Sequence, residues 1–192
     1  MAPDVWVMFR PGRAYATLAA TDGRGAWIAF RRPLRLLFVL AAAGSLLTSG
    51  RISLRLVVAC AECALFLPLL LVASAALAGG RTVSLARAID LFFMSLGPWM
   101  LWVLPLTALW AFLPAERAYE LLEYRWLWYW AALAAFAWSC IIDFWFLRRV
   151  CGRSPGHAVA WLAAQRLIVW IAGLAIFLGG SGWQVVATRF GW

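Results

Sequence analysis

The chain has 192 residues, of which 66% are hydrophobic and 13% charged, and its formal net charge is +9. A soluble domain is about half apolar and a quarter charged, so a soluble globule of this length could not bury so much apolar surface. The composition excludes a soluble enzyme, a disulfide-stapled secreted domain and a disordered tail, and it predicts an integral membrane protein.

Two short segments precede the first apolar run, around residues 11–20 and 25–32. They mix aromatic and aliphatic side chains with arginine, which is typical of helices that lie in the headgroup plane. We therefore expect a cytoplasmic or interfacial N-terminal segment over residues 1–33. A docking arm for a soluble partner is the alternative interpretation.

Five apolar runs follow, and a membrane-spanning helix needs roughly 20 apolar residues. The runs cover residues 34–49, 56–78, 88–113, 126–147 and 158–179. The predicted fold class is all-α: a polytopic integral membrane protein with five transmembrane helices over residues 34–180 and an external C-terminal tail over 181–192. Ser154 and Pro155 predict the start of the fifth helix, as cap and first-turn proline. In the third run, Pro98 and Pro105 predict a bent helix.

The arginines predict the orientation. Eleven lie before the first run or in the second and fourth joints, and five lie on the opposite side. Because arginine is enriched in cytoplasmic loops, this asymmetry predicts a cytoplasmic N-terminus and a periplasmic C-terminus in a bacterial inner membrane. Near the predicted inner ends, we expect six arginines to bind lipid headgroups: Arg31, Arg32, Arg35, Arg148, Arg149 and Arg153.

Tryptophan is abundant, with 14 in the chain. Five of these rings fall near the ends of predicted helices and are expected interfacial anchors: Trp126, Trp128, Trp130, Trp145 and Trp161. Small residues gather in the first run (residues 41–45) and the fourth (131–135), and we expect these faces to make tight contacts, internally or with a partner. We expect Trp102, Trp138 and Trp170 on looser surfaces.

Ionisable residues inside apolar runs are the candidate site, because burying them is costly unless they are paired. From a rise of about 1.5 Å per residue, Asp143 lies roughly 6 Å and Arg166 about 12 Å from the inner helix ends. We predict an Asp143–Arg166 pair between adjacent helices, with Asp90 and Gln165 nearby. Glu62 is an isolated acid in the second run. Fixing helix packing is the favoured role, with a proton relay or substrate binding as alternatives.

No arrangement of residues for catalysis emerges. Cys60 and Cys63 form a CxxC motif, but the second pair and the histidines that usually complete a zinc site are missing. The single histidine, His157, also excludes a bis-histidine haem. We expect no enzyme activity, no metal and no cofactor.

The layout resembles bacterial members of the YIP family. The resemblance rests on the segment FRPGRAY, the arginine-flanked RRPL at the first run, five closely spaced runs, and SLARAIDLFFMSLGPW at the third. It implies five spans, a cytoplasmic N-terminus and no catalytic residues. Eukaryotic members of this family bind Rab-type GTPases, but the chain does not have their long polar N-terminal region, which does not favour GTPase binding.

Two functions remain open. The first is a non-catalytic scaffold or accessory subunit of a larger redox, photosynthetic or transport complex, with membrane lipids and other integral membrane subunits as partners and no nucleic acid. The second is a small oligomeric carrier or channel. Five spans rarely enclose a pore alone, which favours the first.

Overall fold

The computed structural model describes residues 3–21, 26–49, 52, 54, 57–58, 67–78, 83–114, 117, 120 and 124–179. All regular secondary structure in these ranges is helical, which confirms the predicted all-α class. Within them, two helical stretches are long and apolar enough to cross a membrane, Leu85–Leu109 and Trp126–Arg149. Five membrane spans therefore remain a prediction.

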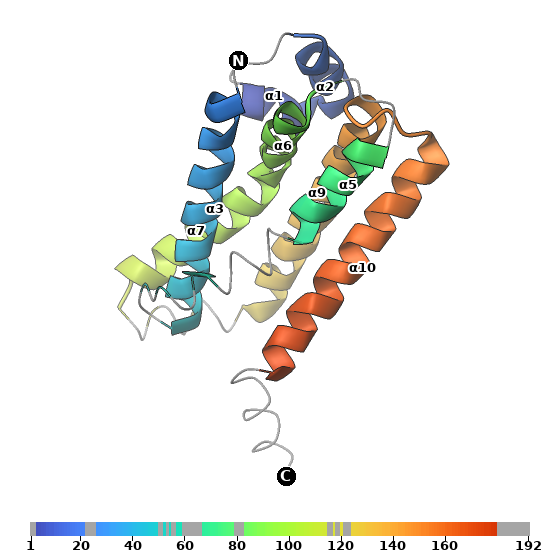
Figure 1. Cartoon of the computed structure of the whole chain (residues 1–192). Coiled ribbons are helices and arrows are strands. Elements are labelled where there is room, and N and C mark those ends of the chain that lie inside the picture. The colour runs from blue at the N-terminus through green and yellow to red at the C-terminus, as the bar shows by residue number, and fades with distance from the viewer. Residues whose placement is uncertain are drawn as a thin grey trace.

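The longer helices form a bundle (Figure 1), in which Leu85–Phe93 and Gly97–Phe112 follow one another in the same direction and the other successive helices alternate in direction. They are α3 (Ala26–Ser49), α5 (Leu67–Ala78), α6 (Leu85–Phe93), α7 (Gly97–Phe112), α9 (Arg125–Arg149) and α10 (Pro155–Gly179). α3 packs on α6 and α7, α5 packs on α6 and α10, and α9 packs on α7 and α10. The first, third, fourth and fifth predicted runs coincide with these helices, whereas much of the second run and the tail at 181–192 lie outside the described residues.

The third run is bent, as its prolines predicted. A short 3₁₀ turn, η2 (Met94–Leu96), joins α6 to α7 directly before Gly97 and Pro98. Because Pro98 has no backbone N–H, the helix loses one α-helical hydrogen bond there and tightens locally. Pro105 lies inside α7 without interrupting it.

Two short helices lie across one end of the bundle, α1 (Pro3–Phe9) and α2 (Pro11–Ala20) (Figure 1). α2 matches the segment predicted at 11–20, whereas α1 was not predicted. The separate segment predicted at 25–32 is wrong, because α3 begins at Ala26 and continues through Arg31 and Arg32. No glycine or polar turn residue separates that segment from the apolar run, and proline is tolerated within apolar helices.

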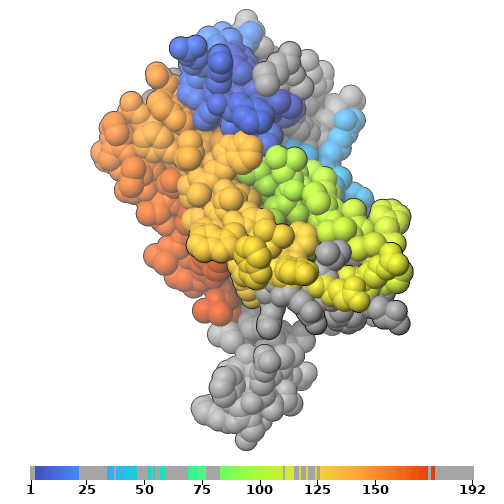
Figure 2. All heavy atoms as spheres, turned by 180° about the vertical axis from the view of Figure 1, so that it is seen from behind, coloured from blue at the N-terminus to red at the C-terminus, as the bar shows by residue number. Residues whose placement is uncertain are grey.

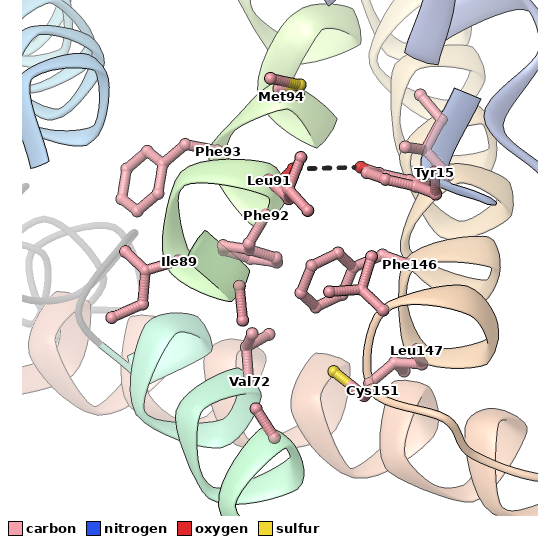
Figure 3. Close-up of a cluster of buried hydrophobic side chains, with 14 of the residues drawn as sticks. Tyr15, Val72, Ile89, Leu91, Phe92, Phe93, Met94, Phe146, Leu147 and Cys151 are labelled. Carbon is pink, nitrogen blue, oxygen red and sulfur yellow. Dashed lines mark hydrogen bonds between the residues drawn. The ribbon is translucent and has the colours of Figure 1, made fainter. Parts of the chain in front are cut away.

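The core gathers where α2, α6 and α9 meet (Figure 3). The ring of Phe146 lies 5.6 Å from that of Tyr15 and 5.7 Å from that of Phe92, both in edge-to-face contacts. Val7 of α1 and Tyr15 of α2 are fully buried in the same cluster. The N-terminal helices therefore share one core with the bundle.

The joint between α9 and α10 fixes how these two helices pair. Gly152 has a φ of 64°, a left-handed conformation that glycine adopts without steric cost. The turn lets the Arg153 N–H donate to the Leu147 carbonyl at 3.0 Å. The Ser154 hydroxyl accepts from the His157 N–H at 3.4 Å, which confirms the predicted cap of the fifth helix.

The small residues of α3 make internal contacts. Ala41, Ala43 and Ser45 are buried, and α3 packs against α6 and α7. On α9, Ala135 is buried whereas Ala134 is exposed. The small residues predicted to pack tightly are thus buried inside the bundle on α3, whereas on α9 some are buried and others exposed.

Candidate functional site

An ion pair joins α9 to α10, as the sequence predicted. One guanidinium nitrogen of Arg166, Nη2, donates to Asp143 Oδ2 at 2.6 Å and to the Ser139 hydroxyl at 3.0 Å. Ser139 and Asp143 lie one turn apart, so α9 presents both acceptors to the same arginine. The Asp143 side chain is 5% exposed and that of Arg166 is 19% exposed. Such a charge-assisted contact fixes the register of the two helices.

Two polar atoms of this pair have no hydrogen-bond partner among the described residues: Asp143 Oδ1 and Arg166 Nε. The Arg166 guanidinium carbon also lies 5.3 Å above the ring of Phe136, so an aromatic face supplies part of its surroundings. Each residue of the pair thus has one polar atom in a hydrogen bond and another polar atom without a partner in the part of the chain that the structure describes.

The structure brings together two of the four residues predicted for this polar cluster. Asp90 instead accepts from Arg87 on its own helix at 2.8 Å, and Arg87 also donates to the Leu18 carbonyl of α2 at 3.3 Å. Gln165 is buried, whereas Arg166 donates its hydrogen bonds to Asp143 and Ser139 of α9. The isolated acid Glu62 lies outside the described residues.

Sequence reasoning missed two long-range hydrogen bonds that hold α1 and α2. The Trp138 indole N–H donates to the Met8 carbonyl of α1 at 2.8 Å. The Tyr15 hydroxyl donates to the Leu91 carbonyl of α6 at 3.3 Å (Figure 3). Burial raises the pKa of Tyr15 well above its ordinary value, and the nearby Asp143 adds to the shift, so Tyr15 stays a neutral donor at physiological pH. Neither contact has a signal in local sequence, because each joins segments at least 76 residues apart.

The tryptophans divide between exposed and half-buried positions. Trp126, Trp130 and Trp170 are mostly exposed. Trp145 and Trp161 pack against the core, Trp128 is half-buried, and Trp99 and Trp102 meet edge to face at 6.1 Å. Trp138 was predicted on a looser surface, and this prediction is wrong, because its indole N–H donates to a carbonyl of α1. Trp170 does lie on an exposed face.

The arginines predicted to bind headgroups are used in different ways. Arg148 donates to the Arg153 carbonyl at 3.1 Å, and Arg153 donates to the Ala75 carbonyl at 2.7 Å. Arg35 and Arg149 are exposed, whereas the side chains of Arg31 and Arg32 lie outside the description. Arg148 and Arg153 thus tie the α9–α10 joint together, and Arg149 stays outward.

The remaining candidate reactive side chains are the cysteines and the histidine. No group of three His, Cys, Asp or Glu residues there could hold a metal ion. Burial raises the pKa of the Cys151 thiol to about 12, with a smaller opposing effect of Arg153, so this cysteine stays protonated and unreactive. His157 pairs with the cap residue Ser154 and is part of a helix start.

Comparisons with known proteins add no relative: no family model, curated protein or solved structure matches the chain.

Proposed function

We propose that the chain is a non-catalytic, multi-pass protein of a bacterial inner membrane that serves as a scaffold or accessory subunit of a larger assembly. The observation that carries the proposal is the use of Arg166. Its guanidinium donates from Nη2 to Asp143 and Ser139 of the neighbouring helix. A buried charge that is paired with a neighbouring helix favours a role in helix packing over a role in a transport path.

The outer faces of α9 and α10 support membrane insertion. Large apolar side chains are exposed along both helices, among them Trp130, Leu133, Ile141, Leu167, Trp170, Ile171 and Leu174. In water such a continuous surface would cause association, whereas in lipid it is the expected exterior. The proposal includes five spans, with α1 and α2 at the cytoplasmic face, and it keeps the resemblance to the YIP family as its framework.

One face of α9 suits a partner helix. Ala134 and Ala137 are exposed on it between Leu133 and Ile141, and Figure 2 shows α9, in yellow to orange, running along the surface seen from that side. Because helices in lipid associate by close backbone approach, small outward residues favour a protein neighbour. The exposed face of α10 carries larger side chains (Leu167, Trp170, Leu174), which suit lipid.

A carrier or channel is the second candidate, and the unpartnered atoms Asp143 Oδ1 and Arg166 Nε favour it. A buried carboxylate oxygen without a donor could accept a proton or contact a small polar substrate. The two candidates differ in what loss of the ion pair would do: a scaffold loses stability, whereas a carrier loses transport while it stays folded.

Solubilisation of native membranes in mild detergent tests the proposal. The tagged chain should co-migrate with other membrane subunits on a native gel. Ala134→Trp should release them by blocking close approach on α9, whereas the control Ala163→Trp, at an exposed position of α10, should leave the complex intact. Migration of the wild-type chain as a lone monomer would overturn the proposal.

A further inference from the structure

A pocket outside the α9–α10 ion pair opens where α2 meets the end of α9. It has a volume of about 630 Å³ and is lined by Arg10, Pro11, Gly12, Arg13, Ala16, Trp145 and Arg149. Figure 2 shows the N-terminal helices, in blue, lying directly against the orange end of α9. The three arginines come from segments about 136 residues apart in sequence, so only the fold brings them together.

The pocket is strongly cationic. None of its lining residues is acidic, and in the part of the chain that the structure describes no carboxylate pairs with Arg10, Arg13 or Arg149. No side chain caps the first turn of α2 either, so its backbone N–H groups add positive potential at the same place. Three like charges that share one hollow repel one another, and a bound anion would relieve that repulsion.

Trp145 forms the wall of the pocket, and Gly12 lets α2 reach it. A Cβ atom at position 12 would lie 3.1–3.3 Å from the indole ring, which is closer than most side chains tolerate. The Arg149 guanidinium lies 5.5 Å above the same ring, and this contact holds the cation in place. The cationic groups are thus arranged on a packed aromatic surface.

The surroundings favour a lipid as the source of the anion. Arg149 is the last residue of α9, which is one of the two helices long and apolar enough to cross a membrane, so the pocket lies at headgroup depth if that helix spans. Ile141 lies one turn before Trp145 on α9, farther from the end of the helix at Arg149, and is exposed. An acyl chain that leaves the pocket past Trp145 would therefore continue along an apolar face.

We propose that this pocket binds the phosphate group of an anionic phospholipid, with the arginines contacting the phosphate oxygens and Trp145 contacting the glycerol region. Arginine suits this task because its planar fork donates two hydrogen bonds to one phosphate. The inference rests on the proposed membrane insertion, and it adds a specific lipid site to it.

The full-length chain in detergent, titrated by calorimetry with dihexanoyl phosphatidylglycerol, tests the site. Loss of charge-assisted contacts in Arg10→Gln/Arg13→Gln should weaken binding by about tenfold or more. The matched control Arg117→Gln removes one charge from an exposed position outside the pocket and should change binding by less than about twofold, in comparison with Arg13→Gln alone. Circular dichroism checks that all variants fold, and Arg10→Lys/Arg13→Lys, which keeps the charge but loses the fork, should bind with intermediate affinity.

Three results would overturn the proposal. Equal weakening in Arg13→Gln and the control Arg117→Gln would mean general charge attraction. Equal affinity for dihexanoyl phosphatidylcholine would remove the selectivity for an anionic lipid. Binding of inorganic phosphate as tightly as the lipid would mean a site for a free anion. Carbonate extraction of the wild-type chain tests membrane insertion separately: a retained chain without lipid selectivity contradicts only the pocket, whereas a released chain contradicts the proposed function.

Discussion

Arg166 holds α10 against α9 through a single nitrogen that serves two acceptors. Removing the arginine alone would leave Asp143, which is 3% exposed, without its cation. An uncompensated buried charge is costly, whereas removal of both partners is often close to neutral. Loss of one partner should therefore cost more stability than loss of both.

Arg166→Leu should lower the free energy of unfolding by about 3 kcal/mol, and Asp143→Leu/Arg166→Leu should recover much of that loss. Arg35→Leu is the control, because it removes an exposed arginine and should cost less than about 0.5 kcal/mol. Thermal unfolding in detergent, followed by circular dichroism, measures all three. Single variants that unfold at the wild-type temperature would show that the pair does not hold the helices.

The sequence could predict this pair because depth depends only on position along a helix. Asp143 and Arg166 lie at similar levels once the arginine side chain extends toward the end of its helix. Ser139 as the second acceptor was not predicted, because a serine in an apolar helix has no distinguishing signal before its neighbour is known. Asp90 was expected at the same level, but its local partner Arg87 lies three residues away on the same helix face.

At the scale of elements, α1 is the main feature that composition did not reveal. It is a seven-residue helix, too short to be stable alone, and it depends on tertiary contacts. Val7 is its fully buried residue, and the Trp138 indole binds its Met8 carbonyl. The long apolar helices were predictable because periodicity and length identify them, whereas a helix made by its partners leaves little pattern.

Val7→Asp should therefore detach α1 from the bundle, because a carboxylate without a partner costs several kcal/mol in an apolar core. Val5→Asp is the matched control on the same helix, since Val5 is 38% exposed. Limited chymotrypsin digestion measures the effect: cleavage after Phe9, the last residue of α1, should accelerate at least about tenfold in the first variant, if detachment costs α1 more than about 1.4 kcal/mol of protection. Equal cleavage rates in the two variants would contradict the role assigned to Val7.

At the scale of the whole molecule, the alternating helices bring separated arginines to one end of the bundle. Arg10 and Arg13 precede α3, Arg87 lies at the start of α6, and Arg148 and Arg153 flank the α9–α10 joint. These elements share the end at which α1 and α2 lie (Figure 1). The sequence could predict this arrangement from charge alone, because alternation of direction between successive apolar runs sends every second joint to the same side. It could not predict the packing order, which depends on which small and large faces fit together.

The topology test follows from that shared end. If it faces the cytoplasm, as the eleven-to-five distribution of arginines predicts, alkaline phosphatase fused after Trp192 should be active and a fusion at Gly152 inactive. Fluorescence of matched fusions to green fluorescent protein, which fluoresces in the cytoplasm, should show the opposite pattern. Replacing Arg148, Arg149 and Arg153 together by Gln should weaken this preference, whereas replacing Arg117 should not. An active phosphatase at Gly152 of the wild-type chain would place the α9–α10 joint outside, and five spans with a cytoplasmic N-terminus would then be excluded.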